Sequence, residues 1–186
     1  MFPINLDLAR LSVALVGNGQ ATLNRLRQLD GDGARYVTVY AEDPIAELVD
    51  QAGDRLHRYL PNSADVNAAA ILFIVDLPHE KAAELAAIAK AVGTIANVED
   101  VKEYCDFFSP ARVTRGDLMI TVSTNGLSPR LAGRIRRAIE KWLEPGWSER
   151  LNALAVERAK WKAGGASMRQ LQQNTDEFID SRGWFS

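Results

Sequence analysis

Sulfur and imidazole side chains are scarce in this chain of 186 residues. Cys105 is the only cysteine, so no disulfide can form within the chain, which fits a reducing compartment. The two histidines, His57 and His79, lie far apart in the sequence and form no group with Cys105 that is typical of a resident metal site. We therefore expect no bound metal, and a metal ion handled by this protein would be a substrate.

Long apolar runs and a strong net charge are missing as well. No apolar run reaches the roughly 18–20 residues that a membrane-spanning helix needs. The first ten residues include Asp7 and lack a basic stretch before an apolar core, so we expect no signal peptide. The net charge of −2 argues against binding to nucleic acid. We expect a cytoplasmic protein with neither a membrane nor a nucleic acid as partner.

Short apolar segments alternate with helical patterns over the first hundred residues. Leu23, Leu26 and Leu29 show the spacing of a helix over residues 20–30, and an Ala-rich segment predicts a second helix over 79–91. Strands alternating with helices predict an α/β fold of Rossmann type, with a parallel sheet covered on both faces. The predicted strands are 12–16, 36–41, 71–75 and 94–98, with a less clear one at 56–60.

The pattern changes after Asp100. Arg115-Gly116-Asp117 separates two strand-like segments and predicts a β-hairpin. Ser128-Pro129 is a typical helix start, and Ser167 with Gln170 makes a capping-box pattern for a later helix. We expect three parts: an α/β domain (1–112), a hairpin and helix region (113–145) and a helical C-terminal module (146–186).

The first strand ends in a glycine turn that is typical of dinucleotide binding. Gly17 permits the tight turn, and Gly19 allows the backbone to approach a diphosphate at the start of the following helix. Thr22 stands where the third glycine of that pattern would be. An ordinary strand-to-helix turn is the alternative. Glu42, at the end of the second strand, is placed to accept from a ribose hydroxyl; a solvated loop at Glu42-Asp43 is the alternative. As a ribose contact Glu42 would repel a 2′-phosphate, which favours NAD over NADP.

Two further features are not explained by a nucleotide-binding fold. Asp100 follows a predicted strand at the edge of the sheet where α/β proteins bind ligands, although a turn or helix-capping role is the alternative. The loop Ser123-Thr124-Asn125-Gly126-Leu127-Ser128 is rich in small polar residues and opens a helix with a basic face. Its side chains can donate to carboxylates, or they can satisfy their own backbone.

Four segments together resemble the family of precorrin-2 dehydrogenases and sirohydrochlorin ferrochelatases, which includes the N-terminal half of bacterial siroheme synthase. The segments are VGNGQA, NVED, DFFSPARVTRGDL and ITVSTNGLSPRLA, and the resemblance covers residues 1–145. It implies an oxidoreductase that passes a hydride from precorrin-2 to NAD, yielding sirohydrochlorin. It also implies a possible second, lyase activity that inserts ferrous iron to make siroheme, and a homodimer formed through the region beginning near Arg112.

The resemblance also implies roles for individual residues. The catalytic acid falls on Asp100. Its cofactor contacts fall on Gln20, Ala21, Glu42 and Asp43, and we also expect cofactor contacts from Gly17, Asn18, Gly19, Asp76 and Asn97. Substrate contacts fall on Ser123, Thr124, Asn125, Gly126 and Ser128. Relatives carry a Thr-Asp pair after the fourth strand, whereas this chain has Val75 and Asp76.

Two alternatives remain open at this point. The first is a dehydrogenase without chelatase activity. The second belongs to a different class of protein: a degenerate relative that binds NAD or a tetrapyrrole as a sensor or carrier. Val75 and the missing third glycine are its only support.

Overall fold

The computed structural model describes residues 2–185, which divide between Ser109 and Pro110 into two compact units. The first unit contains a parallel five-stranded sheet in the order β3-β2-β1-β4-β5. Its strands are β1 (Ser12–Val16), β2 (Tyr36–Tyr40), β3 (Leu56–His57), β4 (Ile71–Ile74) and β5 (Ile95–Val98). The predicted α/β fold of Rossmann type is confirmed.

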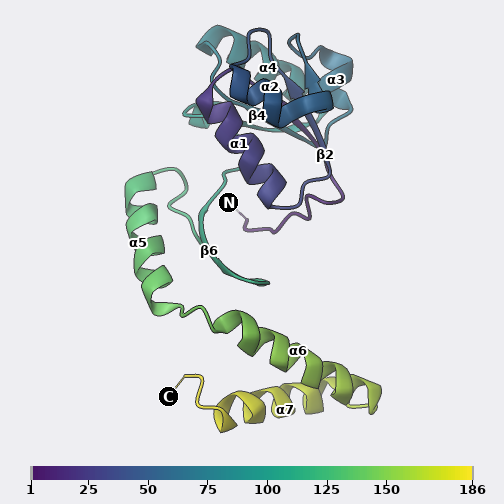
Figure 1. Cartoon of the computed structure of the whole chain (residues 1–186), viewed down its shortest axis with the longest axis vertical. Helices are drawn as coiled ribbons and strands as arrows, with labels where there is room; N and C mark the ends of the chain where they lie inside the picture. Colours follow the sequence, from purple (N-terminus) through teal and green to yellow (C-terminus); the bar gives the residue numbers. More distant parts are fainter. Residues whose placement is uncertain (1, 186) are drawn as a thin grey trace. The chain divides into compact units, whose positions relative to one another are not determined.

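Helices cover both faces of this sheet (Figure 1). Because side chains alternate along a strand, Val13 and Leu15 of β1 face one layer, and Ala14 and Val16 face the other. The first layer contains α1 (Gln20–Gly31) and α2 (Ala46–Ala52), and the second contains α3 (Ser63–Asn67) and α4 (His79–Val92). Strands buried on both faces explain why the sequence shows continuous apolar runs.

The third strand and α3 are where the sequence prediction was least accurate. The strand expected over 56–60 has only two residues, and β2 ends one residue before its expected end. The helix α3 was not predicted. Its five residues are too few for a periodic pattern, and a capping box stabilises it: Asn62 accepts from Asp65 N while Asp65 accepts from Asn62 N.

The second unit contains the predicted hairpin, formed by β6 (Ala111–Arg115) and β7 (Leu118–Val122). Three helices follow: α5 (Pro129–Trp142), α6 (Trp147–Ala163) and α7 (Met168–Ser181). Figure 1 shows α6 and α7 as an antiparallel pair. Short 3₁₀ turns also occur at Gly53–Arg55 and Lys102–Tyr104.

The second unit buries few apolar side chains. Its buried hydrophobic side chains among the described residues are Val113, Ala132, Leu143 and Leu171, and all other members of the core lie in the first unit. Aromatic contacts join α6 to α7 and to the residues that follow α7, including Trp161 with Phe178 and Trp147 with Trp184. The separate module expected from residue 146 onward stays a prediction.

Candidate functional site

The glycine turn after β1 is tightly packed. Gly17 has φ of 153°, and its N–H donates to Tyr40 O at 3.0 Å. A Cβ atom on Gly17 would lie 2.0 Å from Val75 O and 2.2 Å from Thr22 Oγ1. Only glycine therefore fits between the carboxyl end of β4 and the first turn of α1.

The carboxylate of Asp76 reaches the start of α1 from the end of β4. Its Oδ2 accepts from Thr22 N at 2.8 Å and from Thr22 Oγ1 at 3.1 Å. The N-cap of α1 is Gly19, which has no side chain with which to cap the helix. Asp76 supplies that cap and satisfies the hydroxyl of the fully buried Thr22. Thr22 is thus part of the turn's structure, a role the sequence did not indicate.

This arrangement fits a dinucleotide. Gln20 and Ala21 are the first two residues of α1, and they precede Thr22, whose N–H donates to Asp76. Helix starts of this kind bind phosphate groups. Gly19 also keeps room beside Asp76, since a Cβ there would lie 2.9 Å from Asp76 Oδ2. The bound group would supply the oxidised nicotinamide that accepts a hydride.

Asn18 fixes the loop that follows β2. Its Oδ1 accepts from Asp43 N at 3.0 Å, and its carbonyl accepts from Ile45 N at 2.9 Å. Glu42 is exposed in this loop, and its carboxylate forms an ion pair with Lys81 of α4. The structure therefore brings Asn18, Glu42 and Asp43 to the glycine turn, as the cofactor assignment requires.

Acidic groups gather where β4 and β5 end. Glu99 and Asp100 follow β5 directly, and both residues keep a large part of their surface exposed. Partial burial raises the pKa of the Glu99 carboxyl, and the charges of Asp76 and Asp100 raise it further, while Arg25 opposes them. Burial lowers the pKa of Arg25, whose guanidinium lies 5.0 Å from the centre of the Phe73 ring. No pattern in the sequence indicates this contact between α1 and β4.

Asn97 lies inside the fold beside these groups. Its amide nitrogen donates to Phe107 O at 2.9 Å and to Cys105 Sγ at 3.6 Å. The Cys105 thiol donates to Val98 O at 3.1 Å, and burial raises its pKa. Asn97 and Cys105 thereby anchor the segment that follows Asp100. The cofactor contact assigned to Asn97 stays a prediction.

In the second unit, the loop 123–128 bonds largely to itself. Ser123 Oγ accepts from Asn125 N, and Thr124 Oγ1 accepts from Ser128 N, each at 3.1 Å. Ser128 caps α5 as expected, its Oγ accepting from Leu131 N at 3.3 Å. The hydroxyl oxygens serve as acceptors here, so their hydrogens remain available to carboxylate oxygens. The substrate contacts of this loop stay a prediction.

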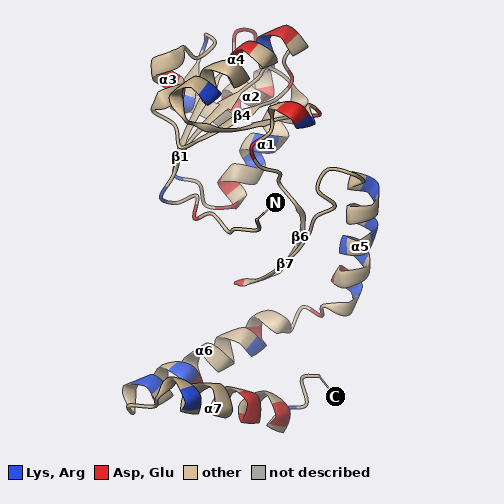
Figure 2. Cartoon of the chain, turned by 180° about the vertical axis from the view of Figure 1, so that it is seen from behind, with Lys and Arg blue, Asp and Glu red and all other residues tan. Residues whose placement is uncertain are grey.

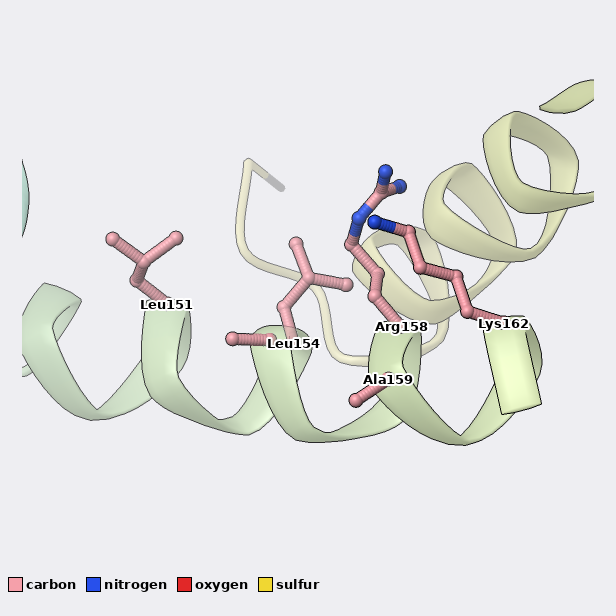
Figure 3. Close-up of a pocket in the computed structure, with 6 residues that line it drawn as sticks. Leu151, Leu154, Arg158, Ala159 and Lys162 are labelled. Atoms are coloured by element: carbon pink, nitrogen blue, oxygen red, sulfur yellow. The ribbon is translucent and has the colours of Figure 1, made fainter.

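Lysine and arginine residues follow α5 along its length (Figure 2). Arg134, Arg137 and Lys141 line a shallow groove on this helix, together with Ala138. A second groove, on α6, is lined by Leu151 and Leu154 toward one end and by Arg158 and Lys162 toward the other (Figure 3). Arg158 also donates to Thr175 Oγ1 of α7 at 2.6 Å, which ties the two helices together.

Three of the predicted site residues have a left-handed backbone conformation. Among residues 2–185, the non-glycine residues with positive φ are Asp76 (55°), Asp100 (60°) and Asn125 (51°). Each was assigned to the site from the sequence. Residues in this left-handed region carry a conformational cost and cluster at functional sites.

Within the described part of the chain, no group of three or more His, Cys, Asp or Glu side chains is arranged to hold a metal ion. The same residues include no helix that is both long and apolar enough to span a membrane.

Strand order, glycine turn and strand-end acids together define a dinucleotide-binding protein of Rossmann type. The family described as "Putative NAD(P)-binding" matches residues 4–111, more than half of the chain, and the chain belongs to that family. Residues 115–141 match the family described as "Sirohaem biosynthesis protein central". These matches confirm the resemblance to siroheme enzymes that the sequence motifs indicated.

Several proteins similar to this chain carry the name siroheme synthase. The one from Stutzerimonas stutzeri (strain A1501) is 33% identical over 172 residues, which cover 90% of this chain and 37% of that protein. The one from Chromobacterium violaceum is 35% identical over 151 residues, which cover 78% of this chain and 32% of that protein. This chain thus spans about a third of the length of these relatives.

A solved structure shares the fold. "SirC, precorrin-2 dehydrogenase" superposes with a TM-score of 0.76 and 23% sequence identity, covering 100% of this chain and 93% of that one.

Proposed function

We propose that this protein oxidises precorrin-2 to sirohydrochlorin with NAD as hydride acceptor, a step of siroheme biosynthesis in the cytoplasm. The observation that carries the proposal is the pairing of a dinucleotide turn with an exposed, positive-φ acid, Asp100, at the end of β5. The match of residues 115–141 to a sirohaem biosynthesis family supports the choice of substrate. Nothing among residues 2–185 favours a non-catalytic sensor or carrier.

The chain's residues divide the chemistry between them. We assign Gly17, Gly19, Gln20 and Ala21 to the diphosphate, and the loop containing Glu42 and Asp43 to the adenosine ribose. Oxidation of precorrin-2 removes a hydride and a proton, and the hydride passes to the nicotinamide. The carboxylate of Asp100 accepts the proton, as a general base within reach of the reacting carbon would.

Substrate binding is assigned to the second unit. Precorrin-2 carries many carboxylates, so its binding needs hydrogen-bond donors and positive charge. Ser123, Thr124, Asn125, Gly126 and Ser128 supply donors in the loop before α5. Arg134, Arg137 and Lys141 supply positive charge along α5.

The test is turnover of precorrin-2 with NAD, followed by the absorbance of NADH and of sirohydrochlorin. Replacement of Asp100 by Asn should leave NAD affinity unchanged and lower kcat by a factor of about 10² or more, the usual contribution of a positioned base. Asp54→Asn, at another exposed acid of the first unit, is the matched control and should keep full activity. Normal turnover by the Asp100→Asn protein would refute the assignment.

Ferrochelation is a separate proposal. Asp100 could also remove pyrrole protons as ferrous iron enters sirohydrochlorin, with iron as a substrate. Addition of ferrous iron to sirohydrochlorin and this protein should then speed the spectral change of metallation. If the rate equals that of the uncatalysed reaction, the protein is a dehydrogenase alone.

We further propose that the protein acts as a homodimer formed through the second unit. Leu127 is 82% exposed, Leu131 50% and Ile135 40%, all at the start of α5 or just before it. A unit with four buried hydrophobic side chains gains stability by covering such a surface with a second copy. Light scattering at micromolar concentration should give twice the mass of the chain, and a monomer would exclude this assembly.

A further inference from the structure

One ion pair in the first unit links segments that lie on opposite sides of the glycine turn. Glu42 follows β2, and Lys81 lies in the first turn of α4, which follows β4. In the sheet, β1 and its turn at Gly17 lie between β2 and β4. The ends of β2 and β4 are therefore two strand spacings apart, about 10 Å. Two long side chains are needed to join them.

Stability does not account for this pair. The Lys81 side chain is 42% exposed and that of Glu42 is 46% exposed. Exposed ion pairs contribute little to stability, since water and salt screen them. Both groups are accessible to a ligand that enters beside the glycine turn.

The pair lies at the position assigned to the adenosine ribose, where its charges affect which form of the ribose can bind. An acid at the end of the second strand accepts from the ribose hydroxyls of NAD and repels a 2′-phosphate. An ammonium bonded to that acid offsets its charge and offers three donors of its own. A 2′-phosphate placed near Glu42 would therefore meet Lys81 as well.

We propose that Lys81 is a specificity-determining residue that lets the ribose site take the 2′-phosphate of NADP as well as the free hydroxyl of NAD. With NAD, Lys81 holds the Glu42 carboxylate in position to accept from the hydroxyls. With NADP, the ammonium leaves Glu42 and bonds to the phosphate. This inference rests on the proposed cofactor site.

The experiment measures the Kd of NAD and of NADP for the full chain by calorimetry, without substrate. The wild-type protein should bind NADP no more than about tenfold more weakly than NAD. Lys81→Ala should weaken NADP binding by about tenfold, equivalent to about 1.4 kcal/mol, while the Kd of NAD changes less than about threefold. Added salt should weaken NADP binding more in the wild type than in this variant.

Lys90→Ala is the matched control, because it removes the same charge from the last turn of the same helix. It should leave both constants unchanged. Glu42→Gln should strengthen NADP binding. Equal losses for both cofactors in Lys81→Ala, or no loss of NADP binding, would overturn the role of Lys81. Failure of the wild-type protein to bind NAD would instead overturn the cofactor site itself and, with it, this inference.

Discussion

At the scale of single residues, the glycine turn requires that residue 17 has no Cβ atom. Any side chain on Gly17 would meet a backbone carbonyl, which cannot move without displacing β4. Thr22 and Asp76 fill the remaining space, and their hydrogen bonds hold the end of β4 to α1. Thr22, which stands in place of the third glycine, therefore stabilises the turn through its hydrogen bonds to Asp76.

Gly17→Ala should destabilise the protein by about 3 kcal/mol or more, because it combines an overpacked contact with a backbone angle unfavourable to alanine. Denaturant unfolding would measure the loss. Gly31→Ala is the control, since nothing lies within 4 Å of a Cβ there. It should be neutral or slightly stabilising. Similar unfolding midpoints for the two variants would show that the turn tolerates a side chain.

Glu99 makes the stability of the folded protein depend on pH. Its pKa is raised in the folded protein, first by burial and then by Asp76 and Asp100. A raised pKa means that the carboxyl favours folding while protonated, and that this contribution is lost as the pH rises from the ordinary value of 4.5 through the folded value. Glu99→Gln should therefore have a higher Tm than the wild type at neutral pH, and the advantage should disappear in acid.

A control for this titration is Glu103→Gln, at an exposed glutamate in the 3₁₀ turn Lys102–Tyr104. Its Tm should follow that of the wild type at every pH. A Glu99→Gln protein whose Tm falls below the wild type at neutral pH would show that the charged form is favoured instead.

At the scale of elements, the long strands and helices could be predicted, and the contacts between them could not. β1 matches its predicted range because a strand buried on both faces leaves a continuous apolar run between turn residues. Asp100 was proposed from its position after such a strand together with the family resemblance. The partners Thr22–Asp76 and Glu42–Lys81 were missed because each is separated by tens of residues, and no local pattern records a contact between elements.

The start of α5 offers a test of one element. Ser128→Ala removes the acceptor for Leu131 N and should cost about 1 kcal/mol in the free energy of unfolding. Ser128→Asn should restore most of that stability, because asparagine also caps helices. If stability returns but turnover of precorrin-2 does not, the Ser128 hydroxyl also contacts the substrate. If the alanine variant loses no stability, the observed cap contributes nothing.

At the scale of the whole molecule, the two units carry different proportions of the core. Both apolar layers around the sheet are built from residues before Ser109. Every residue assigned to the cofactor lies in the same unit. Folding and cofactor binding should therefore not need the second unit.

A fragment that ends at Ser109 should unfold cooperatively and bind NAD with a Kd within about threefold of the full chain. It should have no activity toward precorrin-2. Circular dichroism and calorimetry would measure both properties. An unfolded fragment would show that the first unit depends on residues beyond Ser109.

The left-handed backbone at Asp100 sets the stability of the fold against the catalytic role proposed for this residue. An acid held at φ of 60° beside the Glu99 carboxyl lowers the stability of the fold. Glycine adopts that angle without strain and adds no charge. Asp100→Gly should therefore raise Tm while abolishing turnover, as expected where a protein has kept a functional residue at the expense of stability. Variants selected for heat resistance alone would be expected to lose this aspartate.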